Sequence, residues 1–442
     1  MGTASLVILA VGGAVVGLTA LLWFVGRHDA RWKRIARGVW SDAAGELGLE
    51  RSDPPGGRGL AGAIEGFEVS VQTDKNPVVV RARLKGGGRI SKDVRMDAAK
   101  FFPDEKIGPV VSLGDEDFDA LVRVAGREDE VLAALGVEGR AAAKAFIDDG
   151  GKVSGGDLEV ALDLDEDRVV RGVRRMVALA KSLAVGSVAE ALLENATKDP
   201  SAAVRRRNLV ALTRSKPDSK EAIWGLQAAL RDLDPVMRFF AAEQLADNPE
   251  GRDTLVKLVE NRALPEALRA TALERLAEVH PYPTIAPVVA WALSAESVKV
   301  RCAAVWAVGA GNDGSKIEAL ASVASLTPPP ELGEALAESL GQLGGPRAED
   351  ALISLLSHEA REVKEAAATA LGKTGSIRAV EPLLQWAKTG AVGSVARDAV
   401  RSIQARLGDA GAGRLSVVDS VGAEGAVSLE NPIPDEPEKA GS

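Results

Sequence analysis

The stretch of sequence that decides the fold is Val363-Lys364-Glu365-Ala366-Ala367-Ala368-Thr369-Ala370-Leu371-Gly372. Its pattern, called the template below, is an apolar residue, a basic residue, two variable residues, a small residue, three variable residues and an apolar residue. The template recurs along the chain with its first residue at Val204, Met237, Leu268, Val300, Leu332, Val363 and Val395. The steps are 33, 31, 32, 32, 31 and 32 residues. Self-similarity at this period is typical of a solenoid of stacked repeats.

Each period has the pattern of two helices joined by a turn. In the sixth period, residues 363–371 predict the first helix, 372–376 the turn and 379–386 the second helix. The small template residue lets neighbouring helices approach, and the apolar residues fill the layer between them. Glycine follows the template at Gly309, Gly341 and Gly372. We interpret these three glycines as helix C-caps, where positive φ is tolerated.

The second template position forms a column of cations. Its members are Arg205, Arg238, Arg269, Arg301 and Lys364. The column could bind an anionic ligand, but it coincides with the repeat framework, so we expect each side chain to bridge to a neighbouring repeat or loop. The fifth repeat departs from the template with Gly333, and the seventh departs with Ala396. A local cluster comprises Arg205, Arg206, Arg207, Arg214, Lys216 and Lys220. Without interleaved aromatics this cluster indicates a solvated face, or a site for an acidic partner.

These repeats resemble the short bacterial HEAT-like repeats that also occur in phycobilisome lyases. The resemblance covers about residues 188–407, roughly half of the chain. It implies an α-solenoid that binds other proteins along its surface. It does not identify the partner, because a fold does not fix a function. The expected fold class is mainly α, a right-handed solenoid of about seven repeats.

The N-terminus has the features of a membrane anchor. Residues 1–26 carry no charge, and the apolar stretch of residues 6–25 would span roughly 30 Å as a helix. Basic residues follow at Arg27, Arg31, Lys33, Arg34 and Arg37, against the single acid Asp29. Under the positive-inside rule they hold the C-terminal side in the cytoplasm. A cleaved secretory signal fits less well, because there is no basic segment before the apolar run and no A-x-A site after it. Gly13 and Gly17 form a GxxxG pair that could join two anchors in a homodimer, although glycine is common in membrane helices anyway.

Residues 27–187 have the pattern of a membrane-proximal α+β domain. The periodicity predicts helices over 27–50, 128–135, 138–147 and 166–185. Strands are predicted over 60–64, 67–72, 78–84 and 110–113, with a hairpin of 152–154 and 158–164 turning at Gly155-Gly156. The acidic stretch 114–119 could hold a divalent cation, but it lacks the ligand order of an EF-hand loop and is interpreted as a loop or helix cap.

Residues 408–442 lose the periodicity and are expected to form a flexible tail. The repeated pattern within 413–417 and 425–429 could be a small hairpin or two copies of a docking motif, and the alternative is that the tail simply caps the last repeat.

Residues that could catalyse a reaction or bind a metal ion are scarce in this sequence. The single cysteine, Cys302, excludes an internal disulfide and a thiolate metal cluster, and no histidine stands near it in sequence to activate it. HEAT-like hydroxylases that bind two irons use repeated His-Glu pairs, whereas this chain has one, His358-Glu359. Residues 199–403 carry a net charge near −2, which gives no basic surface for nucleic acid. The sequence therefore predicts no catalytic residue, no metal, no cofactor and no enzyme.

The combined prediction is a protein of the bacterial inner membrane, spanning it once, with its C-terminal domains in the cytoplasm. It would act as a scaffold whose repeats recruit protein partners. The alternative is a HEAT-like protein that binds or modifies a small ligand or chromophore, as the resemblance to lyases implies. A copurifying coloured molecule that is lost with the repeats would favour the alternative.

Overall fold

The computed structural model describes residues 38, 40–52, 59–73, 79–99, 109–163, 165–388 and 390–408. The predicted anchor of residues 1–26, its Gly13 and Gly17, and the predicted tail after Gly408 lie outside these residues. Within the described ranges, no single helix is long and apolar enough to cross a membrane, and the two consecutive helices that pass this test together are bent by 103°. The chain forms two compact units, one up to Ala229 and one from Leu230.

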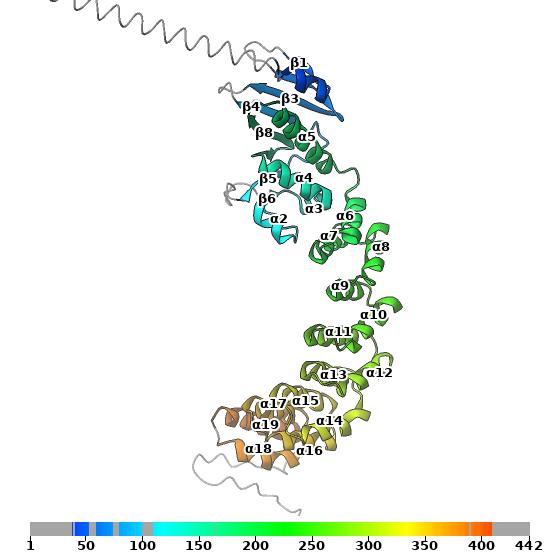
Figure 1. The fold of residues 1–442 in the computed structure, drawn as a ribbon. Coiled ribbons are helices and arrows are strands. Elements are labelled where there is room, and N and C mark those ends of the chain that lie inside the picture. Colours follow the sequence, from blue (N-terminus) through cyan, green and yellow to red (C-terminus); the bar gives the residue numbers. More distant parts are fainter. Residues whose placement is uncertain are drawn as a thin grey trace, which may run out of the picture. The chain divides into compact units, whose positions relative to one another are not determined.

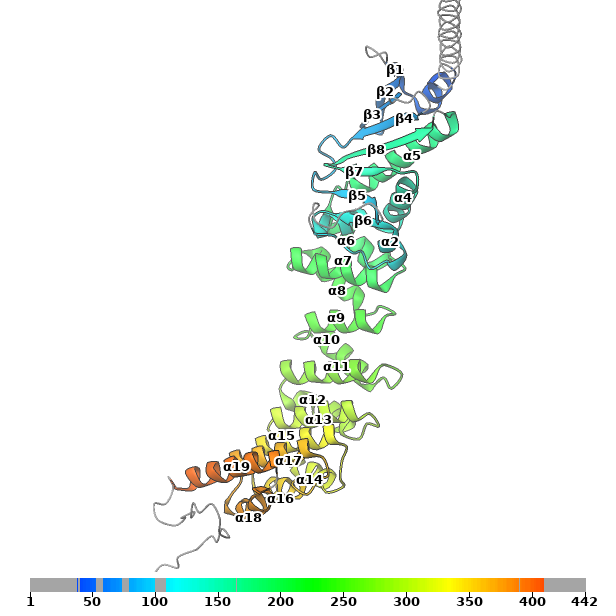
Figure 2. The ribbon, with the colours of Figure 1, turned by 90° about the vertical axis from the view of Figure 1, so that its left-hand side faces the viewer.

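The first unit contains one antiparallel sheet of eight strands, ordered β1-β2-β3-β4-β8-β7-β5-β6 (Figure 2). The strands are β1 (Glu50–Ser52), β2 (Gly59–Ile64), β3 (Phe67–Thr73), β4 (Val79–Lys85), β5 (Arg95–Ala98), β6 (Val122–Ala125), β7 (Lys152–Ser154) and β8 (Asp157–Asp163). The predicted strands at 60–64, 67–72 and 78–84 and the predicted hairpin are confirmed. The predicted strand at 110–113 is wrong, because Val110 makes only an isolated bridge to Ala125.

The strands bury one face and expose the other, as their alternating sequences require. In β3, Phe67, Val69 and Val71 are buried, whereas Glu68 and Gln72 are exposed. The helix α5 (Glu166–Leu183) packs on the buried face against β4 and β8 (Figure 1).

The other helices of this unit are α2 (Glu116–Leu121), α3 (Glu128–Ala134), α4 (Val137–Asp148), α6 (Val188–Lys198), α7 (Ala202–Ser215) and α8 (Lys220–Ala229). Residues 40–47 are also helical. The first repeat, α7 and α8, thus belongs to the same compact unit as the sheet.

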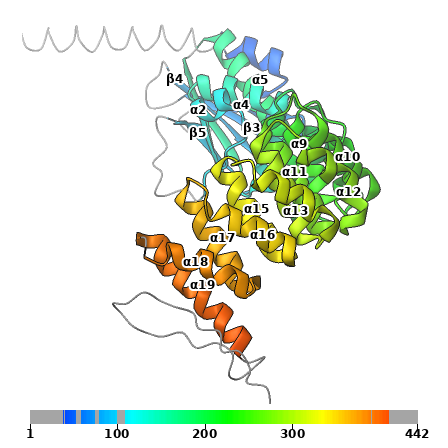
Figure 3. The same ribbon diagram turned by 90° about the horizontal axis from the view of Figure 1, so that it is seen from below.

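The second unit is a stack of helix pairs. Its first helices, called the first-helix row, are α9 (Pro235–Gln244), α11 (Glu266–Val279), α13 (Val298–Ala310), α15 (Pro330–Leu343), α17 (Arg361–Thr374) and α19 (Gly390–Gly408). The second helices are α10 (Pro249–Glu260), α12 (Tyr282–Leu293), α14 (Ile317–Ala324), α16 (Pro346–Leu355) and α18 (Val380–Trp386). Each first helix contacts the next along the row, and Figure 3 shows α10 and α12 on one side of α9, α11 and α13. The chain is therefore mainly helical with stacked repeats, as predicted.

Three glycines have a different role from the predicted one. Gly309, Gly341 and Gly372 lie inside α13, α15 and α17, and their φ angles are not positive, so the C-cap prediction is wrong. A Cβ on Gly341 would lie 2.8 Å from the Cβ of Ala370 on the next first helix. These positions therefore carry glycine because neighbouring first helices approach each other there.

Candidate functional site

The template residues build the contacts between helices. Each first template residue lies in a first helix, and five of them are buried: Val204, Met237, Val300, Leu332 and Val363. The other two, Leu268 and Val395, are partly buried. Burial of this apolar series holds the helix pairs together.

Four of the five cations at the second template position contact backbone carbonyls or an aromatic ring. Nη1 of Arg205 donates to the carbonyl of Asp199 at 2.8 Å, and Nη1 of Arg238 donates to that of Asp232 at 2.7 Å. Nε of Arg269, which is only 6% exposed, donates to the carbonyl of Val259 at 2.9 Å. These carbonyls lie in the last turn of the preceding helix or just after it, where the helix dipole favours a cation.

Arg301 differs from the other cations of the column. In the part of the chain that the structure describes, its Nε is buried without a hydrogen-bond partner. The column is thus not uniform, because only some of its cations donate to a backbone carbonyl of the preceding helix or loop.

Two second helices carry a tryptophan beneath a template cation. Lys364 lies 4.3 Å from the ring centre of Trp386, and Arg269 lies 5.6 Å from that of Trp291. Both tryptophans follow their cation by 22 residues and precede the next first template residue by 9. Such cation–π pairs contribute roughly 0.5–2 kcal/mol each. Sequence reasoning missed them, although the equal spacing was available as a signal.

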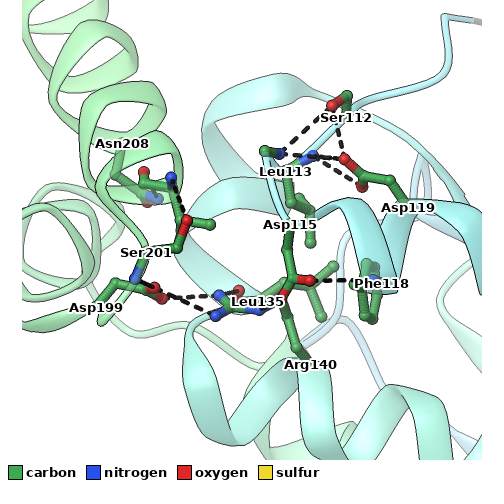
Figure 4. Close-up of polar contacts among 12 residues, drawn as sticks. Ser112, Leu113, Asp115, Phe118, Asp119, Leu135, Arg140, Asp199, Ser201 and Asn208 are labelled. Carbon is green, nitrogen blue, oxygen red and sulfur yellow. Dashed lines mark hydrogen bonds and ion pairs between the residues drawn. The ribbon is translucent and has the colours of Figure 1, made fainter.

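A buried ion cluster joins the α/β part of the first unit to its first repeat (Figure 4). Arg140, on α4, places Nη1 2.8 Å from Oδ2 of Asp199 and Nε 2.8 Å from Oδ2 of Asp115. Asp199 also accepts a hydrogen bond from the amide of Ser201 at 3.0 Å. On the same side, Nδ2 of Asn195 on α6 donates to the carbonyl of Leu132 at 2.9 Å. The sheet-bearing part and the first repeat are therefore fastened by polar contacts as well as by apolar packing.

The acidic stretch 114–119 is used inside the protein. Asp115 caps α2 by accepting from the amide of Phe118 at 3.0 Å, and it also pairs with Arg140. Asp119 accepts from the amides of Leu113 and Gly114 and from the hydroxyl of Ser112 (Figure 4). The carboxylate of Asp115 thus caps a helix, and the carboxylate of Asp119 accepts hydrogen bonds from the preceding loop.

The histidine and cysteine singled out by sequence are structural. Nε2 of His358 lies 2.8 Å from the carbonyl of Pro328, and its Nδ1 accepts from the amide of Ala360 at 3.0 Å. Burial raises the pKa of the Cys302 thiol, and the carboxylate of Glu331 raises it further. Among the described residues, no group of three or more His, Cys, Asp or Glu side chains is placed to hold a metal ion.

Several apolar side chains are exposed on the repeats. Trp224, on α8, is 56% exposed, and Leu326, after α14, is 75% exposed. A pocket of about 290 Å³ between α9 and α10 is lined by charges of both signs, including Arg238, Glu250 and Lys257.

Residues 317–404 match the family model of HEAT repeats. The chain contains HEAT repeats. Its structure is also similar to that of human deoxyhypusine hydroxylase, solved in complex with glycerol. That similarity has a TM-score of 0.23 and 16% sequence identity, and it covers 49% of this chain and 96% of that chain. No curated protein sequence matches the chain.

The comparison corrects one prediction. The sequence predicted that the chain is not an enzyme, and the hydroxylase to which it is similar is one. The similarity does not itself show any enzyme activity in this chain.

Proposed function

We propose that this protein is a membrane-anchored adaptor whose HEAT repeats bind protein partners and hold them at the cytoplasmic side of a bacterial inner membrane. HEAT repeats generally mediate protein interactions, and the observation that carries the proposal is the row of stacked first helices in the second unit, each exposing one face. The charge-free residues 1–26 and the basic residues that follow support the anchor and its orientation.

The anchor and the repeats have complementary roles in this proposal. A partner bound to the repeats is confined near the membrane plane, which raises its effective concentration toward other membrane-bound molecules without any new contact. The binding surface is long, because each repeat adds two helices to the stack.

The test compares partner retention by the full chain with retention by a chain that ends after Ala229. This truncation keeps the first compact unit intact, including the contact between Arg140 and Asp199. Both chains are purified in detergent from the same membranes. A near-stoichiometric protein that copurifies only with the full chain supports the adaptor, and equal recovery from both chains contradicts it.

A second measurement addresses the orientation. A reporter that works only outside the cytoplasm is fused after Ser442, and a cytoplasmic reporter is fused at the same place. Activity of the cytoplasmic reporter is expected. Activity of the external reporter would contradict the orientation, and recovery of the chain in the soluble fraction would contradict the anchor.

A further inference from the structure

One exposed surface of the second unit combines apolar side chains with unpaired acids. On α13, Cys302 and Trp306 are partly exposed and Ala310 is exposed, and their spacing of four residues places them on one face of the helix. Lys299 lies on the same side, but its Nζ is 3.1 Å from Oε1 of Glu266. The outward face of α13 is therefore apolar, and its one lysine is already paired.

The neighbouring helix α15 packs closely against α13. The hydroxyl of Ser339 donates to the carbonyl of Val305 at 2.8 Å, and a Cβ on Gly309 would lie 2.7 Å from Oε1 of Gln342. At this separation the outward faces of the two helices form one surface, which we call the α13–α15 surface. It consists of the apolar residues of α13 and the exposed residues of α15. Figure 3 shows the two helices side by side.

The exposed face of α15 is acidic. Glu331, Glu334 and Glu338 are all exposed and lie on one side of the helix, with the partly buried Ala335 between them. None of the three makes an ion pair with any residue in the described ranges. The helix has no lysine or arginine, because Gly333 stands where five of the other six repeats have the template cation.

Some acids on the neighbouring first helices are paired, in contrast to the three on α15. On α17, Oε1 of Glu365 lies 2.7 Å from Nε of Arg361, and on α11, Oε2 of Glu278 lies 3.0 Å from Nη1 of Arg275. Among the described residues, α17 and α11 each keep one exposed glutamate without an ion pair, Glu362 and Glu274, whereas α15 keeps three such glutamates next to the apolar face of α13.

We propose that the α13–α15 surface binds a basic amphipathic helix of a partner protein. The apolar side of such a helix would cover Trp306 and Cys302, and its lysines or arginines would pair with the three glutamates. Complementary charge fixes the register and speeds association, while the apolar contact slows dissociation. An anionic membrane surface does not fit this site, because the glutamates would repel it. This inference rests on the proposed adaptor function and specifies the chemistry of its partner.

The test uses the full chain in phosphatidylcholine nanodiscs and a labelled leucine–lysine peptide of about four helical turns. Fluorescence anisotropy measures its Kd, with empty nanodiscs, a scrambled peptide and a leucine–glutamate peptide as controls. The variant E331Q/E334Q/E338Q should bind the basic peptide about tenfold more weakly, which corresponds to about 1.4 kcal/mol. The matched control D218N/E260Q/E381Q removes three other exposed acids and should leave the Kd within about twofold.

A reversal of charge gives a second and independent measurement. The variant E331K/E334K/E338K should lose the basic peptide and acquire affinity for the leucine–glutamate peptide. Equal weakening in the two neutralised variants would show that only net charge matters, and it would overturn the inference. The same holds if the scrambled peptide binds as tightly as the amphipathic one. If E331Q/E334Q/E338Q retains the native partner while the chain ending at Ala229 loses it, the adaptor function stands and this surface is not its site.

Discussion

Replacement of Arg140 by methionine tests whether the ion cluster holds the first repeat on the α/β part of the first unit. The side chain of Asp199 is only 1% exposed and that of Arg140 only 8%. Removal of one partner of a buried pair costs about 3–5 kcal/mol, because the other charge stays buried and uncompensated. We expect the lower end, about 3 kcal/mol, since Asp199 keeps its hydrogen bond from the amide of Ser201.

The companion substitution Asp199→Asn should cost less, about 1–2 kcal/mol. The amide oxygen of asparagine can still accept from Ser201, and Arg140 keeps its contact of 2.8 Å with Asp115. In the double variant Arg140→Met/Asp199→Asn no uncompensated charge remains at position 199. The double variant should therefore be more stable than the sum of the single effects, with a coupling of about 1–2 kcal/mol.

Hydrogen exchange of the full chain is the suitable assay, because a chain of two units does not unfold in a single two-state transition. Amides of α4 and α6 should exchange roughly a hundredfold faster in Arg140→Met, as about 3 kcal/mol of lost local stability implies. Peptides from α15 and α17 serve as an internal reference and should not change. Unchanged protection in α4 and α6, or strictly additive effects in the double variant, would refute the reasoning.

Three further predictions concern the second unit. Gly333→Arg restores the template yet should destabilise the second unit by about 1–3 kcal/mol, because a Cβ at this position would lie 2.8 Å from Cγ2 of Val363. Thermal unfolding should show a lower Tm, and a higher Tm would contradict this prediction. Glu349→Ala should lower the free energy of unfolding by about 1–3 kcal/mol, since Oε1 of the buried Glu349 accepts from the amide of Ser376 at 2.7 Å, whereas Glu349→Gln keeps an acceptor and should cost clearly less. Burial raises the pKa of Tyr282, the one tyrosine of the chain, to about 12. Because the unfolded chain releases this proton near pH 10, stability should fall as pH rises from about 10 to 12, and absorbance should show no tyrosinate below pH 10 while the chain is folded.

The repeats could be predicted from the sequence alone. A period of 31–33 residues places an apolar residue, a cation and a small residue at fixed positions, and each predicted first helix is observed. Local strands such as 67–72 were also predictable, because alternation of apolar and polar residues is a property of the segment itself. The three glycines after the template were misassigned, since a glycine at a predicted helix end and a glycine at a close helix contact look alike in sequence.

The sheet order and the junction were decided only by the tertiary structure. Strand β4 pairs with β8 across more than seventy residues, and Val79 faces Asp163 in that pairing. The short strands β1, β5 and β6 carry too few residues to show a pattern by themselves. Arg140 and Asp199 are 59 residues apart, and nothing local to either one indicates the other.

The division follows from the range of the interactions. A helical repeat contacts mainly its neighbours along the chain. The residues that it needs for packing therefore recur within each period of the sequence. The acidic face of α15 shows the limit of this rule. The sequence contains Glu331, Glu334 and Glu338, but it does not indicate that none of them makes an ion pair with another described residue. Ion pairs, strand order and exposed surfaces depend on which distant segments meet, and that is settled by the packing of the whole unit.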